Sequence, residues 1–123
     1  MTNEDIVLSI ETLKEYTSGM IKKCQEAVLL SVESMVNRNL EQAKRIMEND
    51  DDIDLLREYI RDRSVELMAS KHPMIKDLRY IYVLSDISTE LERIGDYAVN
   101  ICKEIVAIGE NEYIKELIDI KSS

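Results

Sequence analysis

Residues 85–102 of the chain read SDISTELERIGDYAVNIC, and their apolar side chains recur at steps of three and four residues. An α-helix turns by about 100° per residue, so this spacing places the apolar side chains on one face. The stripe expected to be buried contains Ile87, Leu91, Ile94, Ala98 and Ile101. The segment therefore predicts a long amphipathic helix that packs against other helices.

The same pattern extends from Pro73 to Ile108. Proline tolerates the first helical position but disfavours helix in the residue before it. We therefore expect His72 to close a turn and Pro73 to start the helix. Gly109 is the expected C-terminal cap. A short tail, residues 111–121, follows with apolar side chains that have no evident partner in the bundle.

Two earlier segments, residues 4–36 and 39–71, show the same periodicity. Their apolar stripes contain Ile6, Ile10, Leu13, Met20, Cys24, Ala27 and Met35 in the first, and Leu40, Ala43, Met47, Ile53, Leu56, Ile60 and Leu67 in the second. Asn39 is expected to cap the second helix, with Gln42 as the reciprocal partner. Helices joined by short turns run antiparallel to their neighbours. The sequence thus predicts an all-α, antiparallel three-helix bundle that forms one domain over residues 1–123.

The composition agrees with a helical protein and excludes several partners. Glycine (3) and proline (1) are scarce, while 25 Asp and Glu against 16 Lys and Arg give a net charge of -9. That charge repels nucleic acid and anionic lipid. No apolar run approaches the roughly 20 residues that span a bilayer, and the N-terminus lacks a basic n-region. We expect a cytoplasmic protein with no nucleic-acid partner and no membrane insertion, and with Cys24 and Cys102 as buried thiols.

Two pairs of acidic residues carry the candidate chemistry. Glu92 and Asp96 lie four residues apart and so stack on one helix face, and Asp50 and Asp54 repeat this spacing in the second helix. Gly95 is unfavourable inside a helix, which indicates that another backbone approaches closely there. If the two pairs face each other, their repulsion calls for protonation or a bound cation. These four acidic residues are the predicted metal ligands.

Two interpretations of these acids stay open. Carboxylate oxygens favour hard or intermediate cations such as magnesium, manganese, calcium or iron. A structural zinc site would need several Cys or His ligands, and the chain has one His and two scattered Cys. The alternative is a purely structural bundle with a solvated acidic face.

The sequence predicts no catalytic residues, and we expect the protein not to be an enzyme. Di-iron carboxylate oxidases use Glu-x-x-His motifs on two helices. Here the only histidine is His72, and Ala69 stands three residues before it. A phosphate-cradling glycine loop and a nucleophile elbow are also absent from the sequence. A carboxylate-bridged metalloenzyme is therefore disfavoured.

Three segments resemble the PhoU family of phosphate-uptake regulators. Residues 91–101, LERIGDYAVNI, resemble the family's signature helix. Residues 72–79, HPMIKDLR, are similar to its Gln-Pro-x-x-x-Asp-Leu-Arg turn, with His72 in the place of Gln. Residues 51–56, DDIDLL, resemble its second-helix acidic segment. The match covers the second and third helices in register, with agreement along the first.

The resemblance implies more than the residues do. PhoU proteins are tandem repeats of a three-helix unit, and each repeat carries a Glu/Asp-x-x-x-Asp motif that binds iron or zinc clusters in some members. The resemblance maps this motif onto Glu92 and Asp96, with Asp50 and Asp54 as co-ligands. It also implies a cytoplasmic negative regulator of phosphate uptake, which links a phosphate ABC transporter to a sensor histidine kinase without turning over a substrate.

The chain departs from the family in length, because it holds one repeat where the family has two. We expect either the N-terminal half of a longer protein or a natural single-repeat relative. Pairing of two chains would replace the missing repeat, so a homodimer is expected. A cytosolic module of a sodium–phosphate cotransporter is the alternative, although the Asp-Leu-Arg turn at residues 77–79 favours the free regulator.

Overall fold

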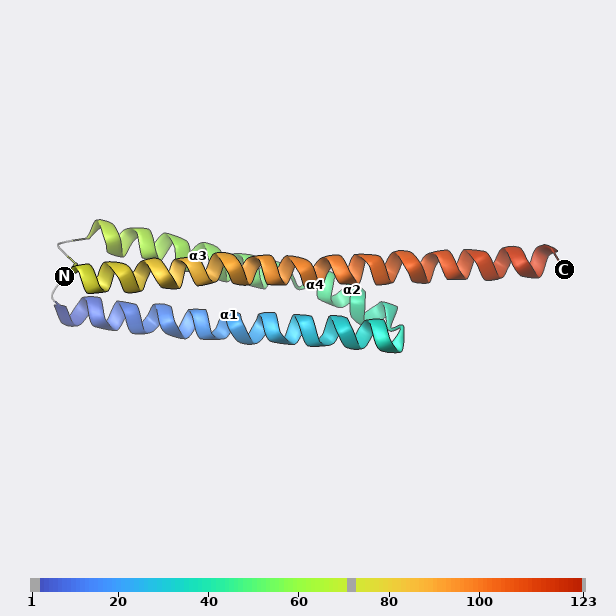
Figure 1. Cartoon of the computed structure of the whole chain (residues 1–123), viewed down its shortest axis with the longest axis horizontal. Coiled ribbons are helices and arrows are strands. Elements are labelled where there is room, and N and C mark those ends of the chain that lie inside the picture. The colour runs from blue at the N-terminus through green and yellow to red at the C-terminus, as the bar shows by residue number, and fades with distance from the viewer. Residues whose placement is uncertain (1–2, 71–72, 123) are drawn as a thin grey trace.

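The structure is a computed structural model that describes residues 3–70 and 73–122, with side chains described at 5–70 and 73–110. It contains the helices α1 (Asn3–Asn37), α2 (Leu40–Glu48), α3 (Asp51–Ala69) and α4 (Ile75–Ser122). Figure 1 shows α2 and α3 following each other in one direction, while α1 and α4 both run the opposite way. The predicted all-α antiparallel bundle of three rods is therefore confirmed.

The second rod is interrupted, where the sequence predicts one helix over residues 39–71. α2 ends at Glu48 and is capped by Asn49, whose N–H donates to the Arg45 carbonyl, and α3 starts after Asp50. Asn and Asp have low helix propensity because their side chains compete for backbone groups. A run of them at residues 49–52 explains why the helix breaks there.

The turn between α1 and α2 carries the expected cap in part. Asn39 Oδ1 accepts a hydrogen bond from the Gln42 N–H at 3.1 Å, as predicted. The reciprocal bond is not made, because Gln42 Oε1 instead accepts from Ser34 Oγ at 3.1 Å. The Asn39 N–H donates to the Ser34 carbonyl at 2.9 Å. Arg38, with a φ of 52°, turns the chain between the two helices.

Most of the predicted core positions are buried. The larger cluster contains Ile6, Ile10, Leu13, Met20, Cys24, Ile53, Ile60, Leu67, Ile81 and Leu84, and a smaller one contains Ala43, Ile46, Cys102 and Ile105. Three predicted core residues, Met35, Ile87 and Ile94, are instead exposed. The buried face of α4 passes through the small residues Ser88 and Gly95, which leaves Ile87 and Ile94 at its edge.

The two cysteines are buried and free, as expected. Cys24 Sγ donates to the Leu91 carbonyl at 3.2 Å, which joins α1 to α4. Burial raises the pKa of both thiols, so each stays protonated at neutral pH.

The limits of α4 differ from the prediction at both ends. His72 lies outside the described residues, and the helix begins at Ile75 rather than at Pro73, with the Met74 carbonyl accepting from the Leu78 N–H at 3.0 Å. Gly109 does not end the helix, which continues to Ser122 and extends beyond the end of α1 (Figure 1). The residues of the predicted tail, 111–121, are therefore helical.

Gly109 serves packing rather than capping. An added Cβ would lie 2.5 Å from Leu40 Cδ2 and 3.2 Å from Leu40 Cγ. The absence of a side chain therefore lets the first residue of α2 pack directly on the α4 backbone.

Gly109→Ala is expected to destabilise the bundle relative to Gly19→Ala. At Gly19 an added Cβ meets no atom within 4 Å. There alanine contributes its helix propensity, about 1 kcal/mol. At Gly109 the gain in helix propensity is opposed by the displacement of Leu40. The unfolding free energies of the two variants should therefore differ by about 1–3 kcal/mol. Urea unfolding measures the difference. Equal stability of the two variants would show that Leu40 moves aside without cost.

Candidate metal centre

The acidic cluster is positioned by the contact between α3 and α4. Asp50 stands at the break before α3, Asp54 lies one turn later, and Asp96 projects from α4. Gly95 makes this approach close: a Cβ there would lie 3.3 Å from Ile53 Cδ1 and 4.0 Å from Asp50 Oδ1. The sequence prediction of a neighbouring backbone is corrected here, because the group that packs on Gly95 is the Ile53 side chain.

Three of the four predicted ligands meet. One carboxylate oxygen from each of Asp50, Asp54 and Asp96 lies within 4.8 Å of the others. Asp50 and Asp54 are partly buried and Asp96 is exposed, so the cluster opens to solvent from the side of α4. Three convergent carboxylates supply oxygen ligands for a hard cation.

The fourth predicted ligand, Glu92, is engaged elsewhere. Its Oε2 lies 2.8 Å from Arg57 Nε in an ion pair that links α3 to α4. The Nε proton has no aligned hydrogen-bond acceptor, so the contact is ionic rather than a directed hydrogen bond. The sequence analysis missed Arg57, although it follows Asp54 by three residues and so neighbours it on the same helix face.

Two members of the cluster, Asp50 and Asp54, have raised pKa values. Burial is the main cause of the raised pKa of Asp50, followed by repulsion from Asp54 and Asp96. Burial also leads the causes for Asp54, followed by repulsion from Asp96, while the Arg57 guanidinium opposes the rise. The charged forms of Asp50 and Asp54 are thus disfavoured in the folded chain.

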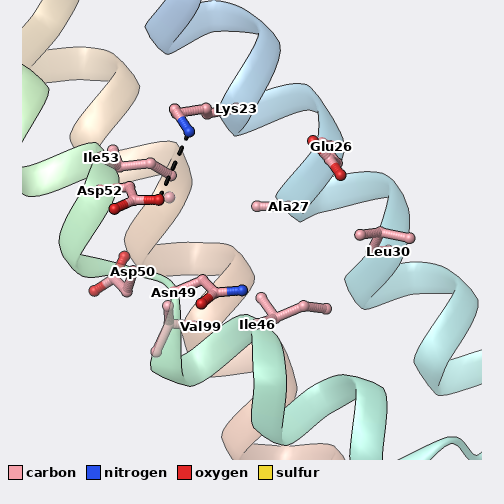
Figure 2. Close-up of a pocket in the computed structure, with 11 residues that line it drawn as sticks. Lys23, Glu26, Ala27, Leu30, Ile46, Asn49, Asp50, Asp52, Ile53 and Val99 are labelled. Atoms are coloured by element: carbon pink, nitrogen blue, oxygen red, sulfur yellow. Dashed lines mark ion pairs between the residues drawn. The ribbon is translucent and has the colours of Figure 1, made fainter.

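A cavity of about 270 Å³ lies beside the cluster, between α1, the α2–α3 break and α4. Figure 2 shows residues of α1 and of the break facing this space. Its lining contains Lys23, Glu26, Ala27, Leu30, Ile46, Asn49, Asp50, Asp52, Ile53, Gly95 and Val99. Lys23 Nζ reaches across from α1 to within 3.7 Å of Asp52 Oδ2. Asp50 therefore borders both the carboxylate cluster and the adjoining cavity.

Comparison with known proteins shows the family of the chain. Residues 17–105, which include α2, α3 and the acidic part of α4, match the family model described as the PhoU domain. The chain belongs to the PhoU family. The family resemblance expected from residues 91–101, 72–79 and 51–56 is confirmed.

Three relatives within the PhoU family show the extent of the match. The chain is 34% identical over 115 residues to the phosphate-specific transport system accessory protein PhoU homolog 1 of Thermotoga maritima. It is 34% identical over 111 residues to the PhoU homolog of Aquifex aeolicus, and 29% identical over 114 residues to PhoU of Escherichia coli. These matches cover 90–93% of this chain. The chain spans 46–50% of the length of these relatives.

Over the described residues, none of the four helices combines the length and apolarity needed to cross a bilayer.

Asp96→Asn is expected to stabilise the metal-free chain at neutral pH. The substitution removes a charge that repels Asp50 and Asp54, and it lies in the interior of α4, away from the helix ends. The gain in unfolding free energy should be about 0.5 kcal/mol, as for other like-charge neighbours. Urea unfolding in the presence of a chelator measures it, with Asp86→Asn, an exposed aspartate on the same helix, as the control.

The stability gained by Asp96→Asn depends on pH, and the direction follows from the raised pKa values of Asp50 and Asp54. An acid whose pKa is raised on folding binds more protons in the folded state, so its contribution to stability increases as the pH falls towards the ordinary carboxyl range. The advantage of Asp96→Asn should therefore shrink as Asp50 and Asp54 protonate. An advantage that stays constant from neutral pH to pH values below the ordinary carboxyl pKa would contradict this account.

Proposed function

We propose that this chain is a regulatory, non-catalytic component of phosphate transport that acts in the cytoplasm. The observation that supports this role is the PhoU domain over residues 17–105. The relatives named above are phosphate-specific transport system accessory proteins. By the same family relation, the proposed partners are a phosphate ABC transporter and a sensor histidine kinase, together with a second copy of this chain.

The acidic cluster is proposed to bind a metal cation. Asp50, Asp54 and Asp96 offer oxygens within 4.8 Å of one another, and a cation between them would relieve the repulsion that contributes to the raised pKa of the first two. All three donors are carboxylates, which favours magnesium, manganese or iron over zinc, since zinc prefers nitrogen and sulfur ligands. Glu92 would join the site only by leaving Arg57.

Binding of Mn²⁺ to the metal-free chain tests this site. Isothermal titration should detect Mn²⁺ binding to the wild type, and Asp96→Asn should weaken it by about tenfold or more, because affinity depends on the number of charged ligands. Glu92→Gln should weaken it less, since Glu92 pairs with Arg57.

The control for this titration is Asp86→Asn, which removes an equal charge from the exposed surface of α4 outside the cluster. If Asp86→Asn and Asp96→Asn reduce Mn²⁺ binding equally, the net negative charge of the chain attracts the ion and the carboxylate cluster is not a specific site. Failure of the wild type to bind Mn²⁺, Mg²⁺ or Fe²⁺ would favour the alternative interpretation, in which the bundle is purely structural and its acidic residues are only solvated.

Loss of the gene that encodes this chain is expected to release phosphate uptake from repression. At high external phosphate, uptake of radiolabelled phosphate should rise several-fold in the deletion strain, because a negative regulator has been removed. Expression of the wild-type chain should restore low uptake. Uptake of an unrelated amino acid is the control and should not change. Unchanged phosphate uptake in the deletion strain would overturn the proposed role, whatever the outcome of the Mn²⁺ titration.

A further inference from the structure

Two contacts define how α1 and α4 lie against each other. Lys14 Nζ sits 4.6 Å above the Tyr80 ring, and Cys24 Sγ bonds the Leu91 carbonyl. A residue of α1 therefore lies beside the residue of α4 that is 66 or 67 positions later. Because the two helices run in the same direction (Figure 1), this register holds along their shared length.

This register aligns two rows of apolar side chains that each repeat every seven residues. On α4 the row begins at Tyr80, and on α1 it begins at Lys14. The rows contain Ile87, Ile94, Ile101 and Ile108 on α4, and Ile21, Val28 and Met35 on α1. Each member of the α1 row stands 66 positions before a member of the α4 row. We call these seven residues the α1–α4 strip.

Five of the seven strip residues are exposed, whereas Val28 and Ile101 are partly buried. Ile87 is 37% exposed, Ile94 42% and Ile108 56%, and Met35 is 54% exposed. Single exposed apolar side chains are ordinary, but a continuous patch of them marks an interaction surface. Seven-residue repeats of isoleucine are the pattern by which helices pack into further helices. This pattern explains why Ile87, Ile94 and Met35 are exposed, although the sequence predicts them to be in the core.

We propose that a second copy of this chain covers the α1–α4 strip. From Tyr80 to Ile108 the strip is about 42 Å long, and two helices side by side are about 20 Å wide. The product, about 800 Å² per copy, matches what each partner buries in a standard stable interface. A two-fold axis would let the same seven residues meet their own counterparts, as in most dimers.

The helix dipoles favour an antiparallel arrangement of the two copies. The dipoles of α1 and α4 add within one copy because these helices are parallel (Figure 1). A copy rotated about a two-fold axis perpendicular to the helices sets its own α1 and α4 dipoles against them.

A pocket at one end of the strip offers additional apolar surface. It has a volume of about 260 Å³ and is lined by Met35, Arg38, Leu40, Ile105, Ile108 and Gly109. In the antiparallel arrangement the Tyr80 end of the second copy lies over this pocket. The partner therefore meets a hollow lined mainly by apolar residues.

This inference deepens the homodimer of the proposed function by naming its surface, and it does not depend on the metal or on phosphate. Ile94 and Asp96 are two positions apart on α4, so their side chains point to nearly opposite faces. A variant at Ile94 therefore tests the strip without altering the carboxylate cluster.

Sedimentation equilibrium of the 123-residue chain tests the proposal. The wild type should have twice the 14.3 kDa mass of one chain at micromolar concentration. Ile94→Glu and Ile87→Glu should raise the dimer dissociation constant at least about tenfold, because each places a charge in an apolar interface. Both residues are already part-exposed, and circular dichroism verifies that the variants remain folded.

The matched control is Leu55→Glu, which makes the same change at a 62% exposed apolar residue on α3. It should leave the dissociation constant unchanged. A wild-type chain that sediments as a monomer would overturn this proposal together with the homodimer of the proposed function. A dimer that Leu55→Glu weakens as much as Ile94→Glu would overturn it as well, because another surface would then form the contact.

Discussion

The packing of Ile53 against Gly95 is the contact on which the arrangement of the acidic residues depends. A Cβ at Gly95 would lie 3.3 Å from Ile53 Cδ1, closer than side chains ordinarily pack, so glycine lets α3 approach α4. The hydrophobic contact holds together groups that repel each other, since Asp50 and Asp54 flank Ile53 and Asp96 follows Gly95. Burial of an apolar side chain thus stabilises a charged cluster that would otherwise separate.

Charge in this cluster is only partly balanced by the protein itself. Arg57 pairs with Glu92, and Lys23 approaches Asp52 from α1, but both cations lie at the edge of the cluster. The oxygens of Asp50, Asp54 and Asp96 remain close together, and the pKa values of two of them are raised. The local excess of negative charge is the physical basis for proposing a cation there.

α4 joins the two proposed surfaces of the molecule. Asp96 projects from one face and Ile94 from nearly the opposite face, while Ala98 and Cys102 are buried in the core between α4 and its neighbours. One rigid helix thus presents a hydrophilic site and an apolar strip along the same stretch of sequence. A second copy on the strip would leave the acidic cluster accessible, which is compatible with both proposals.

The sequence alone determined the helical class and most of the core, because a period of 3.6 residues in apolar side chains is a local property. It also predicted that Asp50 and Asp54 lie near Glu92 and Asp96, since the four-residue spacing within each pair and Gly95 are visible without coordinates. The tertiary structure decided that Glu92 pairs with Arg57, that α2 and α3 are separate, and that α4 continues past Gly109. These features depend on the rotation of each helix about its axis and on contacts between distant segments. Apolar periodicity leaves that rotation undetermined when a helix carries more apolar rows than the bundle buries, as α4 does.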